Sequence, residues 1–311
     1  MHFNVKSTAM VYLAILIAMV FWSLSFIWYK DAYRFFGPMA TVFLRLVISG
    51  SILLAISWIT GNLKINKAHF KLFLLAEFFE PCLYFMAESF GMQLVSSVTA
   101  AVVISTIPIL SPVITSFFYP EKLSTLNIVG ILLSFVGVGM VILNGGLHFE
   151  ASVPGILLMF IAVFAAIGYA MALKKLTPHY KPLTIVAVQN IIGAVLFAPF
   201  FIIFDLQNLT HIFNSQAMLP IFNLAIFSSS IAFIMFAYGV SSIGVTKANT
   251  FTNLIPVITS IFAYFLLNEK FTSLKILGIV VVVGGLFLSQ ISLQTYRRVL
   301  NFILLRRNNK N

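Results

Sequence analysis

Ten long apolar runs, separated by short polar turns, determine what this chain can fold into. A helix needs ~20 mostly apolar residues to cross the ~30 Å core of a bilayer, and each run has about that length. No run alternates between apolar and polar residues as a barrel strand does, so we expect helices. The predicted spans are residues 9–29, 38–60, 70–93, 96–119, 125–144, 153–174, 182–204, 216–240, 245–267 and 273–293.

The composition excludes a water-soluble fold. Apolar residues make up 60% of the 311 residues and charged residues 9%, whereas soluble domains have ~45–50% and ~25%. The mean hydropathy is +1.04, and a soluble protein of this size could not remove so much apolar surface from water. We therefore predict an all-α integral membrane protein, not a soluble enzyme, a disordered chain or a disulfide scaffold. The single cysteine, Cys82, cannot form an intrachain disulfide.

The net charge of +11 comes mainly from the loops. If the N-terminus is inside, fourteen of the 19 Lys and Arg residues lie in inner segments, four lie in outer segments and Arg45 lies within a span. Cytoplasmic loops carry the excess of positive charge in membrane proteins, so we predict a plasma-membrane protein with both termini in the cytoplasm. Nucleic acid is not expected as a partner. The basic tail, residues 296–311, favours contact with anionic lipid, with protein binding as the alternative.

The second half of the sequence repeats the first. Residues 90–140 align without gaps on residues 238–288, with twelve identities in fifty-one positions, and an earlier patch aligns Pro38 with Pro182. Apolar composition alone would not align a proline, a Glu-Lys pair and two glycines at fixed spacing. The matched pairs include Pro108 with Pro256, Glu121 with Glu269, Lys122 with Lys270, Gly130 with Gly278 and Gly137 with Gly285.

Each repeat holds five predicted spans. Because five is odd, the second repeat must enter the membrane in the opposite sense from the first. Inverted repeats are typical of secondary transporters, in which two equivalent halves surround one site near the midplane. We therefore predict ten transmembrane helices as two inverted five-helix repeats, residues 1–147 and 148–295, and transport by alternating access.

Several short motifs resemble a known family. They are the segment Phe21-Trp22-Ser23-Leu24-Ser25-Phe26, the triplet Phe43-Leu44-Arg45, and the repeated order of Pro, Glu and Gly in the two halves. On these residues the chain resembles an EamA-type member of the drug/metabolite transporter superfamily over about residues 10–293. The resemblance implies ten helices, two EamA repeats and transport of small metabolites, often export. The family does not fix the substrate. The chain also departs from the general pattern, because its third span carries three glutamates.

Those glutamates are the leading candidates for a transport site. Ionised carboxylates are costly in lipid and should face the interior of the bundle. At 100° per residue, Glu77, Glu80, Tyr84 and Glu88 fall within a stripe ~80° wide, and Pro81 predicts a kink beside them. We interpret the stripe as the lining of a substrate or proton pathway, with a structural polar seam as the alternative. Glu80, assisted by Glu77, is the hypothetical proton-coupling group.

A second candidate feature is an ion pair between Arg45 and Glu88. Both residues lie ~8–10 Å below the outer ends of their spans at 1.5 Å per residue, and a lone buried cation would be costly. A structural clamp and a gate are both open interpretations. The counterpart of Arg45 in the second half is Gln189, which is uncharged, so the two halves are not functionally equivalent.

Polar and aromatic stripes in two further spans fit a solute site. Such groups suit an amine or a zwitterion such as an amino acid, although hydrogen bonding between helices is an equal alternative. Pro108, Pro112 and Pro256 predict kinks. The stripes are Thr246, Asn249, Asn253, Pro256 and Ser260 in the ninth span, and Trp22, Ser25, Phe26 and Tyr29 in the first.

Other functions are less well supported. The histidines lack ligand spacing, and no phosphate-binding loop is present, so we predict no metal, no cofactor and no catalytic residues. Glu121 and Glu269 are interpreted as turn residues. A polytopic enzyme acting on lipid is the main alternative, and a channel is disfavoured because glutamates on one helix do not form a ring. The expected partners are a small-molecule substrate, the bilayer and protons, and a homodimer is left open.

Overall fold

The computed structural model describes residues 5–61, 65–116, 125–142, 152–207, 213–244, 248–249 and 251–290, and every regular element named among them is helical. The elements are α1 (Val5–Ala32), α2 (Pro38–Ile59), η1 (Lys67–His69), α3 (Phe70–Glu77), η2 (Phe78–Leu83), α4 (Tyr84–Leu94), α5 (Ser97–Ile104), α6 (Ile107–Ser116), α7 (Thr125–Ile142), α8 (Val153–Leu176), α9 (Pro182–Phe204), α10 (Ser215–Asn223), η4 (Leu224–Ala232), α11 (Phe233–Ile243), η5 (Phe251–Leu254), α13 (Ile255–Leu267) and α14 (Ser273–Gln290).

These helices coincide with the predicted apolar runs. Six helical stretches among the described residues are long and apolar enough to cross a membrane, which confirms an all-helical, multi-pass membrane protein. Three shorter apolar helices lie within residues 128–141, 251–267 and 273–285. The third predicted span is divided into α3, η2 and α4 and carries the glutamates. The count of ten crossings stays a prediction.

The helix ends follow local sequence signals. Pro38, Pro154 and Pro182 lie in the first turns of α2, α8 and α9, where the missing N–H would have had no partner in the helix. Helix α11 ends at Gly244, whose φ of 84° is readily adopted only by glycine. Helix α13 ends at Asn268, which adopts a left-handed conformation with a φ of 53°.

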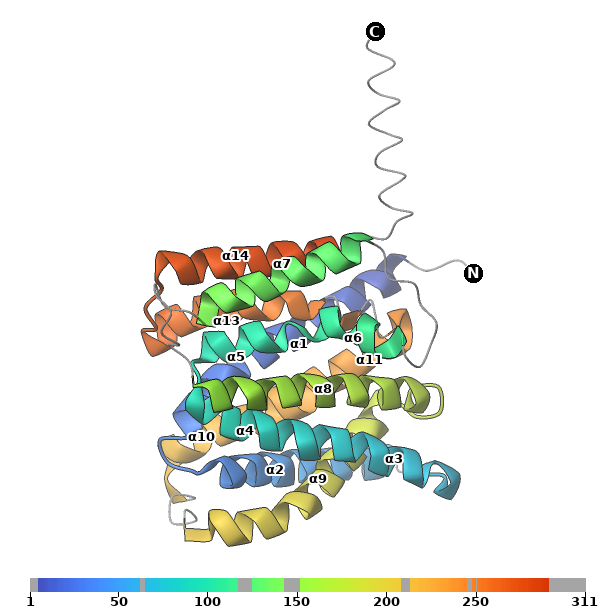
Figure 1. Ribbon diagram of the computed structural model, residues 1–311. Coiled ribbons are helices and arrows are strands. Elements are labelled where there is room, and N and C mark those ends of the chain that lie inside the picture. The colour runs from blue at the N-terminus through green and yellow to red at the C-terminus, as the bar shows by residue number, and fades with distance from the viewer. Residues whose placement is uncertain are drawn as a thin grey trace.

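Helices from the two halves of the chain pack against each other. Helix α7 lies along α14 at one edge of the bundle, and α2 lies along α9 toward the other (Figure 1). Between them, α4 packs on α8, and α1 packs on α11 and η4. Helix α4 belongs to the third predicted span and α8 to the sixth, whereas α11 and η4 belong to the eighth and α1 to the first. The third span of each half therefore packs on the first span of the other half. The centre of the bundle is built from both halves.

Glycines form the contact between α7 and α14. A Cβ atom on Gly137 would lie 2.6 Å from the backbone nitrogen of Val282, and one on Gly278 would lie 2.9 Å from the carbonyl oxygen of Gly137. A Cβ atom on Gly285 would lie 2.8 Å from the carbonyl oxygen of Gly130. Small residues allow membrane helices to approach this closely. The glycines that match between the repeats therefore meet across one contact.

The two halves interrupt their helices at matching places. The wide, π-type turn η2 interrupts the third predicted span, and a second one, η4, interrupts the eighth. The fourth span breaks at residues 105–106 between α5 and α6, and the ninth contains the 3₁₀ turn η5 before α13. Interrupted membrane helices leave backbone groups free to face a cavity.

Candidate functional site

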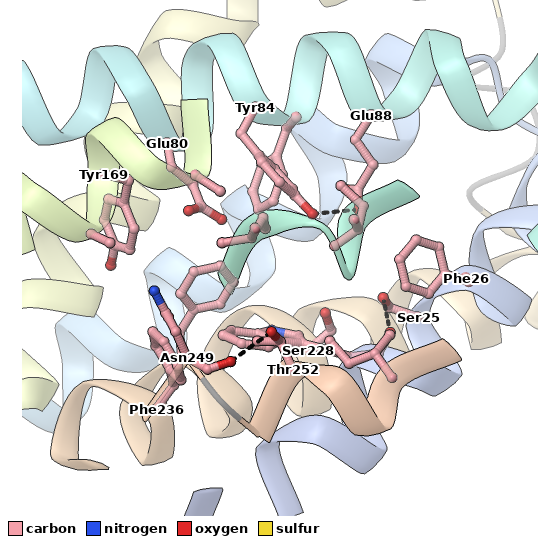
Figure 2. Close-up of a pocket in the computed structure, with 18 of the residues that line it drawn as sticks. Ser25, Phe26, Glu80, Tyr84, Glu88, Tyr169, Ser228, Phe236, Asn249 and Thr252 are labelled. Carbon is pink, nitrogen blue, oxygen red and sulfur yellow. Dashed lines mark hydrogen bonds between the residues drawn. The ribbon is translucent and has the colours of Figure 1, made fainter. Parts of the chain in front are cut away.

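A cavity lies among the central helices, with walls that include α1, α4, α8 and α11 (Figure 2). Its lining residues come from both halves of the chain. Six of the nine residues predicted for the substrate or proton pathway line this cavity, and three do not. The six are Trp22, Arg45, Glu80, Tyr84, Glu88 and Asn249.

The acidic wall of the cavity, defined by Glu80, Tyr84 and Glu88, comes from η2 and α4. Figure 2 shows these side chains together on one side, facing Asn249 and Thr252 on the other. The hydroxyl group of Tyr84 donates a hydrogen bond to Oε1 of Glu88 at 3.0 Å. Glu80 is 5% exposed, and its carboxylate has no hydrogen-bond or ion-pair partner among the described residues. The acidic wall thus holds one tethered and one free carboxylate.

Glu77 does not line the cavity, so the predicted single stripe is wrong at this residue. Its side chain is 1% exposed, and neither carboxylate oxygen has a partner within the described part of the chain. The stripe assumed a regular helix, but Glu80 has non-helical dihedral angles, φ −146° and ψ 116°. This break changes the rotation between the two glutamates. Glu77 lies behind the acidic wall, close enough to interact electrostatically with Glu80 and Tyr169.

Arg45 is buried at the edge of the cavity, at 1% exposure. Its Nε donates to Oγ of Ser229 at 2.7 Å, and its Nη2 donates to Oγ of Ser228 at 3.3 Å. Its Nη1 donates to the hydroxyl of Tyr29 at 2.5 Å. The guanidinium carbon also lies 4.4 Å from the centre of the Phe85 ring, a cation–π contact. All three guanidinium nitrogens are therefore engaged by the protein itself.

The expected direct pair between Arg45 and Glu88 is not formed. Both residues line the cavity, but these two side chains make no ion pair within 4.0 Å. Tyr29 connects them, because its hydroxyl accepts from Arg45 and also interacts with the Glu88 carboxylate. The equal membrane depths predicted for Arg45 and Glu88 therefore identified two residues that lie near each other. The sequence could not show that Tyr29 of α1 connects them.

Gln189 lies outside the cavity, one contact behind it. Its Oε1 accepts a hydrogen bond from the hydroxyl of Tyr169 at 2.8 Å, and Tyr169 lines the cavity. The neighbouring Asn190 donates to Ser49 at 2.6 Å and to the carbonyl oxygen of Ser229 at 3.1 Å. Together these bonds tie α8, α9 and α2 to η4.

An aromatic wall, defined by Trp22, Phe85, Phe233 and Phe236, completes the cavity. The ring centre of Trp22 lies 5.1 Å from that of Phe233 and 4.9 Å from that of Phe236. The sequence indicated Trp22 but not the three phenylalanines. With 33 phenylalanines in the chain, no local signal separates those at the cavity from those that face lipid.

The predicted polar stripe of the ninth span is only partly realised. Asn249 lines the cavity, and its Nδ2 has no hydrogen-bond partner among the described residues. Asn253 is buried away from the cavity, again with no partner within the described ranges. Ser260 donates to the carbonyl oxygen of Pro256 within α13 at 2.6 Å, and Thr246 lies outside the described residues.

Three of the prolines predicted to kink helices lie at the interruptions, and Pro112 lies within α6. Pro81 lies within η2. Pro108 is the second residue of α6, after the break at residues 105–106, and Pro256 is the second residue of α13, after η5. Pro108 and Pro256 thus begin the helices that resume after the breaks, where a missing N–H has no partner in the helix.

Glu269 behaves as a turn and interface residue. Its Oε1 accepts from the backbone nitrogen of Ser97 at 3.2 Å, at the start of α5, and its Oε2 lies 3.9 Å from Nζ of Lys275. Nearby, Lys30 donates to the carbonyl oxygens of Met92 and Val95, at 2.5 and 2.6 Å. These bonds tie one end of the bundle together. The matching residue Glu121 lies outside the described residues.

Two histidines meet in a way that the sequence did not predict. The rings of His69 and His179 are 4.4 Å apart, and Nδ1 of His69 lies 3.0 Å from the hydroxyl of Tyr180. This contact joins the start of α3 to the turn between α8 and α9. Within the described part of the chain, no three His, Cys, Asp or Glu side chains gather as a metal-binding group.

Comparison with known proteins agrees with the geometry. Residues 9–143 and 153–291 each match the EamA-like transporter family. An uncharacterized transporter of Archaeoglobus fulgidus is 28% identical over 277 residues, which cover 89% of this chain and 97% of the relative. The uncharacterized transporter YetK of Bacillus subtilis is 25% identical, over 80% of this chain and 77% of the relative. A WAT1-related chloroplastic protein of Arabidopsis thaliana is 25% identical, over 86% of this chain and 66% of the relative.

A solved structure supports the same fold. A crystal structure, described only as that of a protein, superposes with a TM-score of 0.69 at 18% sequence identity, covering 90% of this chain and 98% of the other. The two matched segments and the transporter relatives favour a membrane transporter that binds small molecules, not an enzyme acting on lipid. The chain belongs to the EamA-like transporter family.

Proposed function

We propose that this protein is a secondary transporter that exports a small polar or amphipathic metabolite, such as an amino acid or an amine, by alternating access. In this proposal ten transmembrane helices form two inverted repeats, residues 1–147 and 148–295, in the plasma membrane. The reciprocal packing of α4 on α8 and α11 on α1, and the matching helix interruptions, support this arrangement. A central cavity lined from both halves fits a single site between two moving repeats.

The observation that carries the proposal is the free carboxylate of Glu80 in the cavity. A buried carboxylate is normally hydrogen-bonded or paired, because leaving it unpaired is costly. The groups that interact with Glu80 are Glu77, Glu88, Arg45, Tyr84 and Tyr169. The unfilled position of Glu80 therefore suits a partner that comes and goes, either a proton or a cationic group of the solute.

Alternating occupancy of Glu80 would couple transport to protons. Facing one side, Glu80 releases its proton and takes up a solute that carries positive charge. Facing the other side, it releases the solute and takes up a proton. The charge on the carboxylate is then balanced at every stage, as a buried site requires.

Transport in proteoliposomes tests this function. The wild-type protein should accumulate at least one labelled compound from a panel of amino acids and amines when a pH gradient is imposed. Glu80→Gln keeps the shape of the side chain but cannot ionise, so gradient-driven accumulation should fall to the level of empty liposomes. If Glu80→Gln and the wild type accumulate the compound equally across pH 5–8, proton coupling at Glu80 is wrong.

A matched control separates coupling from folding. Glu269→Gln makes the same chemical change at a residue outside the cavity and should keep its pH-driven transport. Solute exchange without a gradient is a second measurement, because Glu80→Gln protein that still folds can bind and exchange the amino acids of the panel that carry no net charge. Loss of transport in both variants would contradict a specific role for Glu80.

The proposed topology has its own support and test. The backbone nitrogen of Asn66 donates to the hydroxyl of Tyr180 at 3.1 Å, so the segments around residues 66 and 180 lie at one end of the bundle. In a Cys82-free background, cysteines at Asn66 and Pro178 should resist a membrane-impermeant thiol reagent in intact cells, and one at Gly146 should react. Reaction of the first two from outside would contradict cytoplasmic termini and the proposed orientation.

A further inference from the structure

We infer that the cavity selects a solute with one positive charge, an apolar body and no carboxylate, that is, an amine rather than an amino acid. This inference rests on the proposed function and narrows it. The reasons are the engagement of Arg45, the balance of charge in the cavity and the aromatic wall.

Arg45 is poorly suited to receive a solute carboxylate, because three of its five N–H donors already bind the protein. Arginine binds carboxylates through two parallel N–H bonds from its planar fork. Here the nitrogens of that fork already donate to Tyr29, Ser228 and Ser229, and one face of the guanidinium group lies on Phe85. A carboxylate would have to displace protein partners that hold a residue of 1% exposure.

The charges of the cavity leave a place for one cation. Arg45 and Glu88 lie on either side of Tyr29 and carry opposite charges, so each offsets the other. Among the cavity-lining residues, Glu80 then stands as the carboxylate that makes no ion pair within 4.0 Å and no hydrogen bond, and Arg45 acts on it only at a distance. An ammonium group fits this position. A zwitterion would bring a third carboxylate beside Glu80 and Glu88, and like charges repel strongly in a site shielded from water.

The aromatic wall fits the remainder of such a solute. The ring of Trp22 packs on those of Phe233 and Phe236, at 5.1 and 4.9 Å between centres, and the three rings offer apolar surface. Aromatic faces also attract cations within about 6 Å of the ring centre. The neutral Nδ2 group of Asn249 has no partner among the described residues and can donate to a hydroxyl group on the solute. The cavity therefore combines a carboxylate for an ammonium group with rings for an apolar body.

Three probes of one shape test the charge selection. Phenethylamine, L-phenylalanine and 3-phenylpropanoate share the ring and its two-carbon spacer, and differ in carrying the ammonium group, both charged groups or the carboxylate. Binding to purified protein in detergent is measured by Trp fluorescence and by the shift in melting temperature. We expect phenethylamine to bind at least tenfold more tightly than L-phenylalanine, and 3-phenylpropanoate not to bind. Equal affinities, the reverse order or no binding of phenethylamine at 10 mM would overturn the inference.

Variants locate the selection and separate it from transport. Glu80→Gln should lose the tenfold preference by weakening the amine alone, whereas Glu269→Gln should keep it. If Glu80→Gln does not fold, Glu80→Asp, which keeps the charge, should retain the preference. Transport of L-phenylalanine without any preference for the amine would overturn the inference and leave the transporter proposal standing. Selective amine binding without transport in proteoliposomes would contradict the transporter proposal and leave the inference about charge selection standing.

Discussion

The two halves of the molecule share a scaffold and differ in charge. In the first half, Arg45 of α2 donates to Tyr29 of α1, and in the second half, Gln189 of α9 accepts from Tyr169 of α8. In each half, a polar side chain of that half's second span forms a hydrogen bond with a tyrosine of its first span. The first half places a charge there, and the second half places an amide. The repetition thus accounts for the packing, and the departure from it marks the site.

The third span and its counterpart differ in the same way. Glu80 and Glu88 belong to η2 and α4, whereas the cavity-facing polar group of the matching turn η4 is the hydroxyl of Ser228. Ser228 and Ser229 accept hydrogen bonds from Arg45. The second half therefore supplies neutral groups that hold the charged groups of the first. A nearly symmetric frame carries an asymmetric site.

The largest expected effect comes from breaking the symmetric glycine contact. Gly137→Leu would place its Cβ 2.6 Å from the backbone of Val282, and rigid backbone cannot move aside. We expect a loss of about 3 kcal/mol or more and little monodisperse protein on size-exclusion chromatography. Gly139→Leu is the matched control, because a Cβ atom there meets nothing within 4 Å. Equal yields of the two variants would show that the contact is not needed for the fold.

The next largest effect is expected from removing the polar side chain that binds a tyrosine in each half, Arg45 in the first and Gln189 in the second. Arg45→Ala leaves the nearby carboxylates without their buried counter-ion and should cost about 3–5 kcal/mol. Gln189→Ala leaves one buried hydroxyl without its acceptor and should cost about 1–3 kcal/mol. Thermal unfolding in detergent, followed by Trp fluorescence, measures both. Equal losses of unfolding free energy in the two variants would mean that the charge of Arg45 adds nothing to the stability of the helix bundle.

The smallest effect concerns the coupling of Arg45 to Glu88 through Tyr29. The double variant Arg45→Ala/Glu88→Gln should be more stable than the sum of the single losses predicts, by about 0.5–3 kcal/mol. The same cycle in a Tyr29→Phe background should give a smaller coupling, because the connecting hydroxyl is gone. Strictly additive losses in the original background would show that the two residues are independent.

The positions of the helices were predicted well from the sequence, because the signals for membrane-spanning helices are strong. Each apolar run is long enough to be identified without knowledge of its neighbours. Pro38 and Pro182 begin helices at the expected residues, and Gly244 and Asn268 end helices within a few residues of the predicted ends. The repeat alignment identified the glycine pairs. It could not show that Gly137 meets Gly278, because an alignment compares the halves without docking them.

The site was harder to predict because it depends on departures from regularity. The helical-wheel argument placed Glu80, Tyr84 and Glu88 on one face, as observed, but it failed at Glu77, since the rotation per residue changes inside η2. Phe233 gave no signal above the many other phenylalanines. Both errors arise where local geometry or tertiary packing decides which side chains meet.

The wide turn η4 has a consequence for insertions and deletions. A π-type turn holds one residue more than an α-helical turn, so this span carries one residue that its length does not require. Deleting one residue within Leu224–Phe227 would remove that extra residue and restore a regular helix, so the later side chains would keep their faces. Phe233 and Phe236 would then stay at the cavity. A codon lost from a regular helix rotates every later side chain by about 100°, whereas a codon lost here would change the type of helix and leave the wall of the cavity in place.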